Sequence, residues 1–390
     1  MTFWEDPQLL SLAGKIALGI FLSAITLQLL IHLFVFGRLA RYKEESPQLA
    51  SRLENPPKVS VVICARNEGP NLRKNLPRIL DQDYPAFEVI VVNDDSTDDT
   101  AEVLERLRAE HPHLKSSHHL ETPKPFPGKK FPLTMGIKAA QGEIILLTDA
   151  DCYPASSDWI AAMASRFEPG VELVLGLGRY EPEEGWLNKV VQWETFHTFL
   201  QYASWALAGR PYMGVGRNLA YRRDLFFKTG GFSRHQHIAA GDDDLFVNSV
   251  ANRRNTRICF QAGAETFSQG PSNWVEWREQ KTRHLSVGRF YKASDRLLIA
   301  LYTGSHVLSY VTIPALFATN VPIAWLTVCL PLRWLVQMGV YYRVIPRVGT
   351  PDLWYFSTIF DFLTVGYYSS FVCTVLGDRP VPGFRPRIRR

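Results

Sequence analysis

Cysteine is scarce in this sequence, and charge is absent from two long stretches of it. The 390 residues include 5 cysteines, an odd number without a CxxC pair, which argues against a disulfide framework or a zinc site and fits reduced thiols facing the cytosol. Neither Ile16–Gly37 nor Leu297–Leu332 contains Asp, Glu, Lys or Arg. Because about 18 uncharged apolar residues suffice to cross a bilayer, these patterns exclude intrinsic disorder and a plain soluble enzyme.

The first uncharged stretch predicts an N-terminal transmembrane anchor over residues 1–40. A secretory signal carries its positive charges before the apolar core, whereas Arg38, Arg41 and Lys43 follow it here. By the positive-inside rule, this polarity places the next part of the chain in the cytoplasm. We therefore expect an integral membrane protein, of a bacterial inner membrane, with a cytoplasmic catalytic domain.

Residues 297–378 are predicted to form a C-terminal membrane region with two spans and one further apolar segment. The run Asn320-Val321-Pro322 favours a turn and divides the second uncharged stretch. The second span is expected from about Pro322 to Tyr342. It contains Arg333, which is costly in lipid unless it faces protein or snorkels to the interface.

The last apolar segment, Leu353–Leu376, is interrupted by Asp361 and Gly366. Two spans after the cytoplasmic domain return the chain to the cytoplasm, so a third full crossing would put the basic tail, residues 379–390, outside. We favour a re-entrant or interfacial last segment that keeps this tail inside, with a third full span as the alternative.

The middle of the chain, residues 55–296, is predicted to be an α/β domain. Three β-branched runs have the length of buried strands, and helical patterns lie between them. The strands are expected at Lys58–Cys64, Phe87–Val92 and Glu143–Thr148, the helices near Asn71–Gln82, Asp98–Glu110 and Leu133–Ala140, and a loop at His111–Pro132. Continuous apolar strands separated by helices predict a parallel, Rossmann-like sheet covered on both faces.

Polar residues gather where the three predicted strands end. Arg66-Asn67-Glu68 follows the first strand, Asp94 follows the second, and Asp149 and Asp151 follow the third. Ligands of such sheets bind beyond the carboxyl ends of the strands. Two carboxylates as close as Asp149 and Asp151 repel each other unless a cation lies between them. A Mg²⁺ or Mn²⁺ ion that also meets substrate phosphates would satisfy this requirement.

Three further segments carry candidate functional groups. Lys129, in a predicted exposed loop, can meet phosphate as a point charge. Asp242-Asp243-Asp244 precedes a helical run, Leu245–Ala251, and one of these carboxylates could serve as a general base. Gln280 and Arg283 share one face of a predicted helix, and the guanidinium could clamp a phosphate.

The order of these motifs along the chain is more specific than any one of them. The sequence carries ArgAsnGlu after a strand, AsnAspAspSer after the next, then GlyLys, AspAlaAsp, AspAspAsp and GlnxxArgHis, and finally apolar spans. This ordered set resembles the membrane-bound family 2 glycosyltransferases, which have a GT-A fold. The resemblance covers nearly the whole chain, and it implies an inverting enzyme that uses nucleotide-diphosphate sugars.

The resemblance also implies roles for particular residues. Asp243 would be the catalytic base, with Asp242 beside it. Asp149 and Asp151 would form the metal motif for Mg²⁺ or Mn²⁺, with Asp151 as the direct ligand. The residues expected to bind the nucleotide sugar are Arg66, Asn67, Glu68, Asp94, Lys129, Asp149, Gln280, Arg283 and His284.

His284 stands where this family's motif has a Trp that lines the polymer path in processive synthases. We therefore expect transfer to a lipid or lipid-linked acceptor, with a processive polysaccharide synthase as the alternative. A nucleotidyltransferase would carry a glycine-rich phosphate loop after the first strand, whereas Ala65–Gly69 contains a single glycine. A non-catalytic membrane scaffold is the remaining alternative. The mild net charge of +5 gives no reason to expect a nucleic-acid partner.

Overall fold

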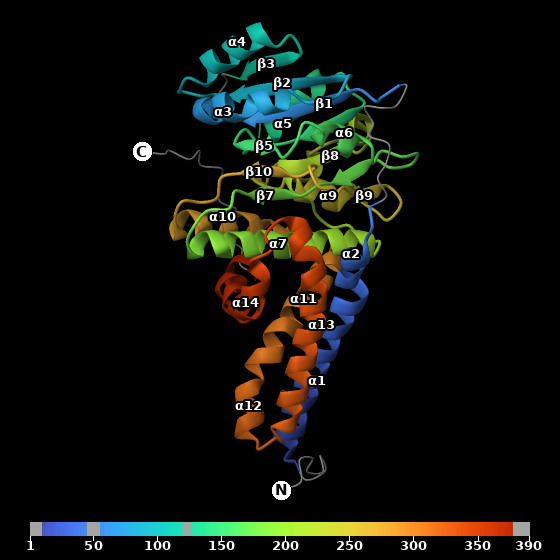
Figure 1. The fold of residues 1–390 in the computed structure, drawn as a ribbon, viewed down its shortest axis with the longest axis vertical. Coiled ribbons are helices and arrows are strands. Elements are labelled where there is room, and N and C mark those ends of the chain that lie inside the picture. Colours follow the sequence, from blue (N-terminus) through green and yellow to red (C-terminus); the bar gives the residue numbers. More distant parts are fainter. Residues whose placement is uncertain (1–9, 45–54, 120–125, 377–390) are drawn as a thin grey trace. The chain divides into compact units, whose positions relative to one another are not determined.

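The computed structural model describes residues 10–44, 55–119 and 126–376 (Figure 1). The chain divides into two compact units. Among the described residues, the helical unit contains 10–42 and 292–376, and the α/β unit contains 43–44, 55–119 and 126–291. The basic tail expected at residues 379–390 lies outside the described residues.

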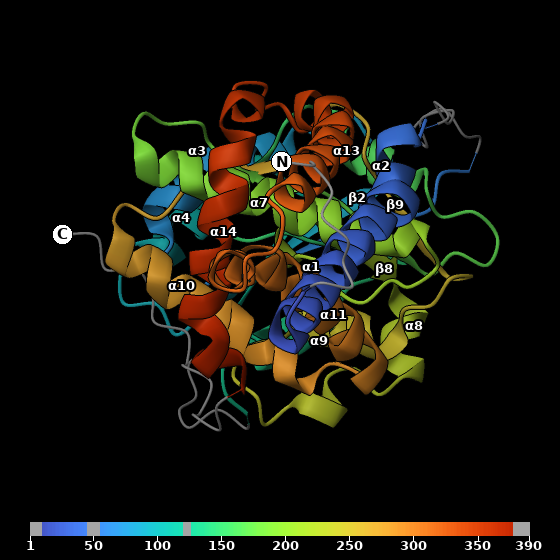
Figure 2. The ribbon, with the colours of Figure 1, turned by 90° about the horizontal axis from the view of Figure 1, so that it is seen from below.

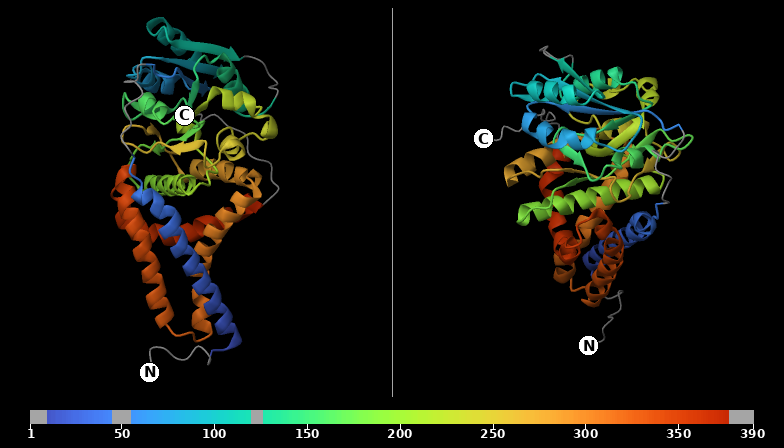
Figure 3. Two further views of the ribbon diagram at one scale, coloured as in Figure 1. Left: turned by 90° about the vertical axis from the view of Figure 1, so that its right-hand side faces the viewer. Right: turned by 45° about the horizontal axis from the view of Figure 1, so that its top comes forward.

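The α/β unit is built on a seven-stranded sheet with the order β3-β2-β1-β4-β8-β6-β9, beside a three-stranded sheet with the order β5-β10-β7. Figures 1 and 3 show the large sheet with helices on both of its faces. The strands are β1 (Val59–Ala65), β2 (Phe87–Asp94), β3 (Leu114–His119), β4 (Ile144–Leu147), β5 (Cys152–Pro154), β6 (Leu173–Leu175), β7 (Gly178–Tyr180), β8 (Leu219–Arg222), β9 (Thr256–Ile258) and β10 (Thr266–Ser268).

Two sequence-based expectations about this sheet are wrong. The sheet is mixed rather than parallel, because β8 lies antiparallel to both β4 and β6; an antiparallel strand on a largely parallel sheet is common in α/β proteins. The predicted loop His111–Pro132 contains the edge strand β3, which pairs in parallel with β2. Its sequence, LKSSHH, has one large apolar residue, so hydrophobic patterning does not reveal it.

The helices of the α/β unit cover the two faces of β1 and β2. Alternate residues such as Val61 and Ile63 face a core formed with α3, α4 and α6. On the other face, Gly136 of α5 lies so close to Val62 that a Cβ at this glycine would overlap the valine side chain. The helices are α3 (Gly69–Leu80), α4 (Thr100–Glu110), α5 (Lys130–Ala139), α6 (Trp159–Ala164), α7 (Trp186–Leu207), α8 (Arg223–Lys228), α9 (Asp244–Val250) and α10 (Trp274–Val287).

Among its described residues, the helical unit has two stretches that are long and apolar enough to cross a membrane, Leu12–Arg41 and Ala293–Ala318. Phe21 and Ile25 of the first stretch share a core with Leu316 of the second. The helices of this unit are α1 (Leu12–Ile31), which continues through a π-helical turn (His32–Phe36) into α2 (Gly37–Arg41), and α11 (Ala293–Val311), α12 (Ile313–Ala318), α13 (Ala324–Val348) and α14 (Leu353–Leu376).

The expected break in the second apolar stretch is confirmed. α12 ends at Ala318, and Asn320 adopts a left-handed backbone conformation with φ 52° before α13 begins. The last apolar segment forms one helix, α14, which is continuous through both Asp361 and Gly366. Figure 2 shows α14 lengthwise, while in Figure 1 it is seen end-on, so it crosses α1 and α13 steeply.

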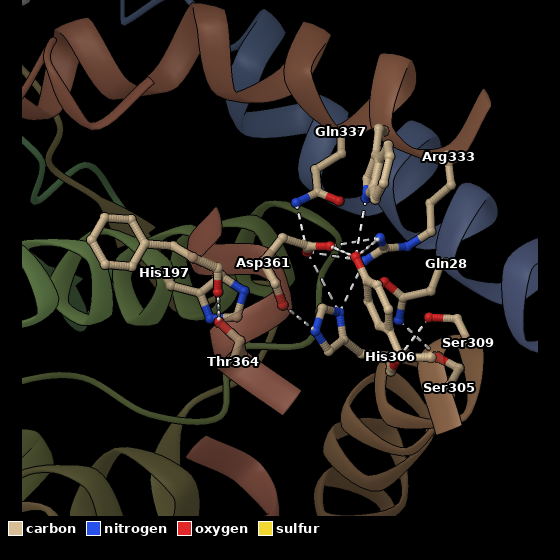
Figure 4. Close-up of polar contacts among 12 residues, drawn as sticks. Gln28, His197, Ser305, His306, Ser309, Arg333, Gln337, Asp361 and Thr364 are labelled. Carbon is tan, nitrogen blue, oxygen red and sulfur yellow. Dashed lines mark hydrogen bonds and ion pairs between the residues drawn. The ribbon is translucent and has the colours of Figure 1, made fainter. Parts of the chain in front are cut away.

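Asp361 does not interrupt α14 because its carboxylate is paired inside the helical unit (Figure 4). Arg333 of α13 donates to Asp361 at 2.7 and 3.0 Å, and Gln337 donates to it at 2.7 Å. Tyr310 of α11 also donates to this carboxylate, and Arg333 donates to His306 at 2.9 Å. Arg333 thus faces protein. The Arg333–Asp361 ion pair joins α13 to α14, and the hydrogen bonds of Tyr310 and His306 connect this pair to α11.

Breaking this ion pair should destabilise the helical unit. Arg333 and Asp361 are 1% and 3% exposed, so Asp361→Asn would leave a buried guanidinium without its counter-charge. Removing one partner of a buried pair costs about 3–5 kcal/mol, whereas replacing both by apolar residues is often close to neutral. We expect a loss of this size for Asp361→Asn and a substantial recovery for Arg333→Met/Asp361→Leu, measured by denaturant unfolding of the detergent-solubilised chain.

Asp352→Asn serves as the control, because Asp352 is exposed just before α14. An Asp361→Asn variant that unfolds at the same denaturant concentration as this control would contradict the structural role of the pair.

Candidate active site

The carboxyl ends of β1, β2 and β4 lie at one edge of the large sheet. Ala65 at the end of β1 is opposite Asn93 in β2, and Leu147 at the end of β4 is opposite Val62 of β1, all in parallel register. The residues that follow these strands therefore leave the sheet at the same edge. The sequence predicted this convergence from the positions of the polar clusters alone.

Asp149 and Lys129 form an ion pair at this edge, with Lys129 Nζ 2.7 Å from Asp149 Oδ1. Burial alone would raise the pKa of Asp149. The positive charge and hydrogen bond of Lys129 have a larger effect than burial, so the pKa of Asp149 lies below its ordinary value. The pKa of Lys129 is raised in turn, since attraction to Asp149 outweighs burial. Both groups are therefore charged. Lys129 is half-buried against Asp149 and does not lie in an exposed loop, because α5 begins directly after it.

Asp149, Asp151 and Cys152 place possible metal-binding atoms within 4.8 Å of one another. Burial, with the nearby charge of Asp151, raises the pKa of the Cys152 thiol well above its ordinary value. The thiol therefore stays protonated, and it donates to Asp151 Oδ1 at 3.5 Å. The two carboxylates are the donors that suit Mg²⁺ or Mn²⁺, which prefer oxygen ligands.

The predicted nucleoside residues lie on the loops after β1 and β2. Asn67 has φ 56°, and its side-chain oxygen accepts from the Thr97 amide at 2.8 Å, so it ties the two loops together. Burial raises the pKa of Glu68 to about 7, and the negative charge of Asp151 adds to this shift. Asp94 is buried at the end of β2. Arg66 lies 3.8 Å from Asp95.

The three consecutive aspartates have different surroundings. Asp243 precedes α9, and its carboxylate accepts from the amides of Gly216 and Asp244, each at 2.7 Å. Burial and the neighbouring charge of Asp242 raise the pKa of Asp243 to about 6. Asp244 accepts from the hydroxyl of Tyr291 at 2.7 Å and from the Leu245 amide at 2.7 Å, which makes it a structural residue of α9.

Electrostatic coupling shows that these groups share one region. The charge of Asp149 contributes to the raised pKa of both Glu68 and Asp243. The buried thiol of Cys64, near the end of β1, has a raised pKa because of burial, and four site residues also act on it. They are Lys129, which lowers this pKa, and Asp242, Asp94 and Asp149, which raise it.

The Gln-x-x-Arg-His motif lies on α10, whose first turn is capped by Asn273. Gln280 donates to the hydroxyl of Tyr180 at 2.9 Å. The charge of Arg283 helps to lower the pKa of Asp149, so it acts on the same site. The side chain of His284 is exposed.

Arg217 is a residue that the sequence analysis did not single out. Its guanidinium lies 4.1 Å from the centre of the Tyr180 ring and donates to the Arg179 carbonyl and the Ser268 hydroxyl, each at 3.1 Å. Its positive charge acts on the pKa of Asp149 and of Cys152. It is one of several arginines in the segment 214–223, and no local pattern distinguishes it.

The raised pKa of Asp243 predicts how transfer should depend on pH. A general base must be ionised, so protonation below a pKa of about 6 should remove activity. We expect kcat/KM to fall about tenfold per pH unit on the acid side and to level off as the carboxylate ionises. Glu68 has a raised pKa of about 7, so its protonation could also change the rate in this pH range. The Glu68→Gln variant is therefore the control, and its kcat/KM should still fall at low pH. A rate that does not change through this range would contradict an ionising base.

Comparisons with known proteins agree with this geometry. Residues 60–230 match the family model described as glycosyl transferase family 2. The probable glycosyltransferase YdaM of Bacillus subtilis (strain 168) is 28% identical over 283 residues, which are 69% of this chain and 65% of that relative. This chain therefore spans slightly less than two thirds of the length of YdaM. The uncharacterized glycosyltransferase YibD of Escherichia coli (strain K12) is 22% identical over 78% of this chain and 92% of that protein.

A solved structure shares the fold. The mannosyltransferase PcManGT from Pyrobaculum calidifontis, in complex with GDP-Man and Mn²⁺, matches with a TM-score of 0.59 and 20% identity, over 93% of this chain and 99% of that chain. The α/β unit thus has the GT-A fold. The match of residues 60–230 to the glycosyl transferase family 2 model agrees with the family that the ordered motifs resemble.

Proposed function

We propose that this protein transfers a sugar, with inversion, from a nucleotide-diphosphate sugar to the hydroxyl of a lipid or lipid-linked acceptor at the cytoplasmic face of a membrane. The observation that carries this proposal is the convergence of Asp149 with both Glu68 and Asp243 at one edge of the sheet. Residues that would hold the donor and a residue that could deprotonate the acceptor thus lie in a single site.

Asp243 has the properties of the base in this reaction. It accepts two backbone hydrogen bonds, which fix its carboxylate, and its raised pKa of about 6 makes it a stronger proton acceptor than an ordinary aspartate. In the proposed step it takes the proton of the acceptor hydroxyl as the oxygen attacks the anomeric carbon. Orientation of the two substrates in one site lowers the barrier further.

The leaving diphosphate needs positive charge near Asp149. Arg217 and Arg283 both act electrostatically on this carboxylate, and Lys129 pairs with it directly. Asp149 and Asp151 fit a divalent cation as oxygen donors. When bound, Mg²⁺ or Mn²⁺ would supply positive charge to the diphosphate as it departs. The Mn²⁺ in the PcManGT complex supports this assignment.

The helical unit supports a membrane location. Leu12–Arg41 and Ala293–Ala318 have the length and composition of membrane spans, and Arg38 and Arg41 lie in the last turn of α2, which favours a cytoplasmic α/β unit. The steep crossing of α14 supports an interfacial last segment (Figure 2).

Two relatives named as beta-monoglucosyldiacylglycerol synthases support a lipid acceptor. The beta-monoglucosyldiacylglycerol synthase of Nostoc sp. (strain PCC 7120 / SAG 25.82 / UTEX 2576) is 32% identical over 154 residues, which are 37% of this chain and 31% of that protein. The family 2 domain favours glycosyl transfer over the nucleotidyltransferase and scaffold alternatives.

The test is a donor panel on membranes that contain the full chain. Radiolabelled UDP- and GDP-sugars are supplied with Mn²⁺, and the products are extracted with organic solvent. We expect label from one donor in the organic phase, and none from membranes with the Asp243→Asn variant. Label in long water-soluble or insoluble chains would instead indicate a processive synthase, and the absence of transfer from every donor would contradict the proposal.

A further inference from the structure

Lys130 lies next to Lys129 but has a different environment. It is fully buried, and its ammonium group donates to three backbone carbonyls, those of His235 at 2.8 Å, Ile238 at 2.8 Å and Ala240 at 2.7 Å. An ammonium group has three donors, so these bonds use its full capacity. All three partners belong to one short segment, residues 235–240.

A second contact joins the same two parts of the chain. Gly128 has φ 77°, and a Cβ at this position would overlap the carbonyl oxygen of Ala239. The turn before α5 therefore lies directly against residues 235–240, and the close approach requires a glycine.

The segment 235–240 leads directly to the proposed base. Gly241 follows with φ 83°, then Asp242, and Asp243 as the N-cap of α9. A short 3₁₀ turn, Ser233–His235, ends at the first residue of segment 235–240, and the segment lies outside the α-helices and strands. Its backbone therefore depends on side chains such as Lys130 to hold one conformation.

We propose that Lys130 is a positioning residue for the proposed base: by binding the carbonyls of segment 235–240, it holds the Asp242–Asp243 turn in the geometry for deprotonating the acceptor. This inference rests on the proposed role of Asp243. Lys130 itself does not touch the reacting groups. Its neighbour Lys129 forms an ion pair with Asp149 of the proposed metal motif. The turn before α5 is therefore joined to the metal motif by Lys129 and to segment 235–240 by Lys130.

The chemistry of Lys130 agrees with this role. Burying an ammonium group is costly unless it is fully hydrogen-bonded. Burial lowers the pKa of Lys130 to about 8, while the charges of Asp242, Asp244 and Asp243 act in the opposite direction. A residue whose only function was to fill space at the start of α5 could be apolar at less cost.

The test is Lys130→Met, which keeps the length of the side chain and removes its donors. We expect kcat for transfer to fall about a hundredfold, because small misplacements of reacting groups have effects of this size. The KM for the donor should stay within about twofold of the wild-type value, since the donor side is untouched. Amide hydrogen exchange should become faster in residues 235–243 and stay unchanged in β1 and β2.

The matched control is Lys138→Met, the same substitution at an exposed position of α5, which should leave all three measurements unchanged. If Lys130→Met does not fold, Lys130→Gln retains a polar side chain with fewer donors and should show the same split between kcat and KM. A kcat and an amide hydrogen exchange rate that are both unchanged in either variant would overturn the proposal. An equal loss of donor binding and of sugar transfer would also overturn it. Absence of transfer by the wild-type chain would instead contradict the proposed function.

Discussion

Replacing Asp243 with asparagine should slow sugar transfer about a thousandfold while leaving donor binding intact. A positioned general base contributes roughly a hundredfold to ten-thousandfold to a rate. Asparagine has nearly the same shape, and its carbonyl oxygen can still accept from one of the two amides, those of Gly216 and Asp244, that donate to separate oxygens of Asp243. The measurement is single-turnover transfer from the radiolabelled donor, together with the KM for that donor.

Asp224→Asn is the control for this variant, because the Asp224 side chain is 74% exposed on α8. It should transfer sugar at the wild-type rate. If Asp243→Asn matched this control, Asp243 could not be the base, and Asp242 would be the next residue to test.

The second large effect is expected at Asp151. Its carboxylate belongs to the group of possible metal donors with Asp149 and Cys152, and Asp149 is already paired with Lys129. Loss of even an indirect partner of a metal ligand costs about tenfold to a hundredfold in metal affinity. We therefore expect Asp151→Asn to require at least about tenfold more Mn²⁺ for half-maximal transfer.

Cys152→Ala is the informative comparison for Asp151→Asn. The raised pKa of the Cys152 thiol keeps it protonated, so this variant should need the same Mn²⁺ concentration as the wild type. A stronger requirement for Mn²⁺ in Cys152→Ala than in Asp151→Asn would assign the metal to a thiolate and contradict the carboxylate site.

Much of the site follows from local sequence because it lies at the ends of strongly apolar strands. β1 and β2 are almost fully buried and rich in valine and isoleucine, so their ends, and the polar residues that follow, are visible in the sequence. The turn at Asn320 and the bounds of α14 were predictable for similar reasons, since both separate long apolar segments from polar or turn-forming residues.

The remaining features depend on contacts between distant parts of the chain. β3 is a polar edge strand, and β5, β7 and β10 have three residues each, too few for a periodic pattern. Lys130 looks like an ordinary solvated lysine until the carbonyls more than 100 residues away enclose it. Arg333 and Asp361 each look unfavourable in an apolar helix, and only the packing of α13 against α14 makes them partners.

The central claim is that carboxylates at the carboxyl edge of the sheet hold a cation against the diphosphate of the donor. Calorimetric titration of the active nucleotide sugar, with Mn²⁺ and with EDTA, tests it most directly. We predict that Mn²⁺ strengthens donor binding by the wild type and by Asp243→Asn to the same degree, and that Asp151→Asn needs at least about tenfold more Mn²⁺ for the same strengthening. Donor affinity that is equal with Mn²⁺ and with EDTA in the wild type, or an Asp151→Asn variant that responds to the same Mn²⁺ concentration as the wild type, would contradict it.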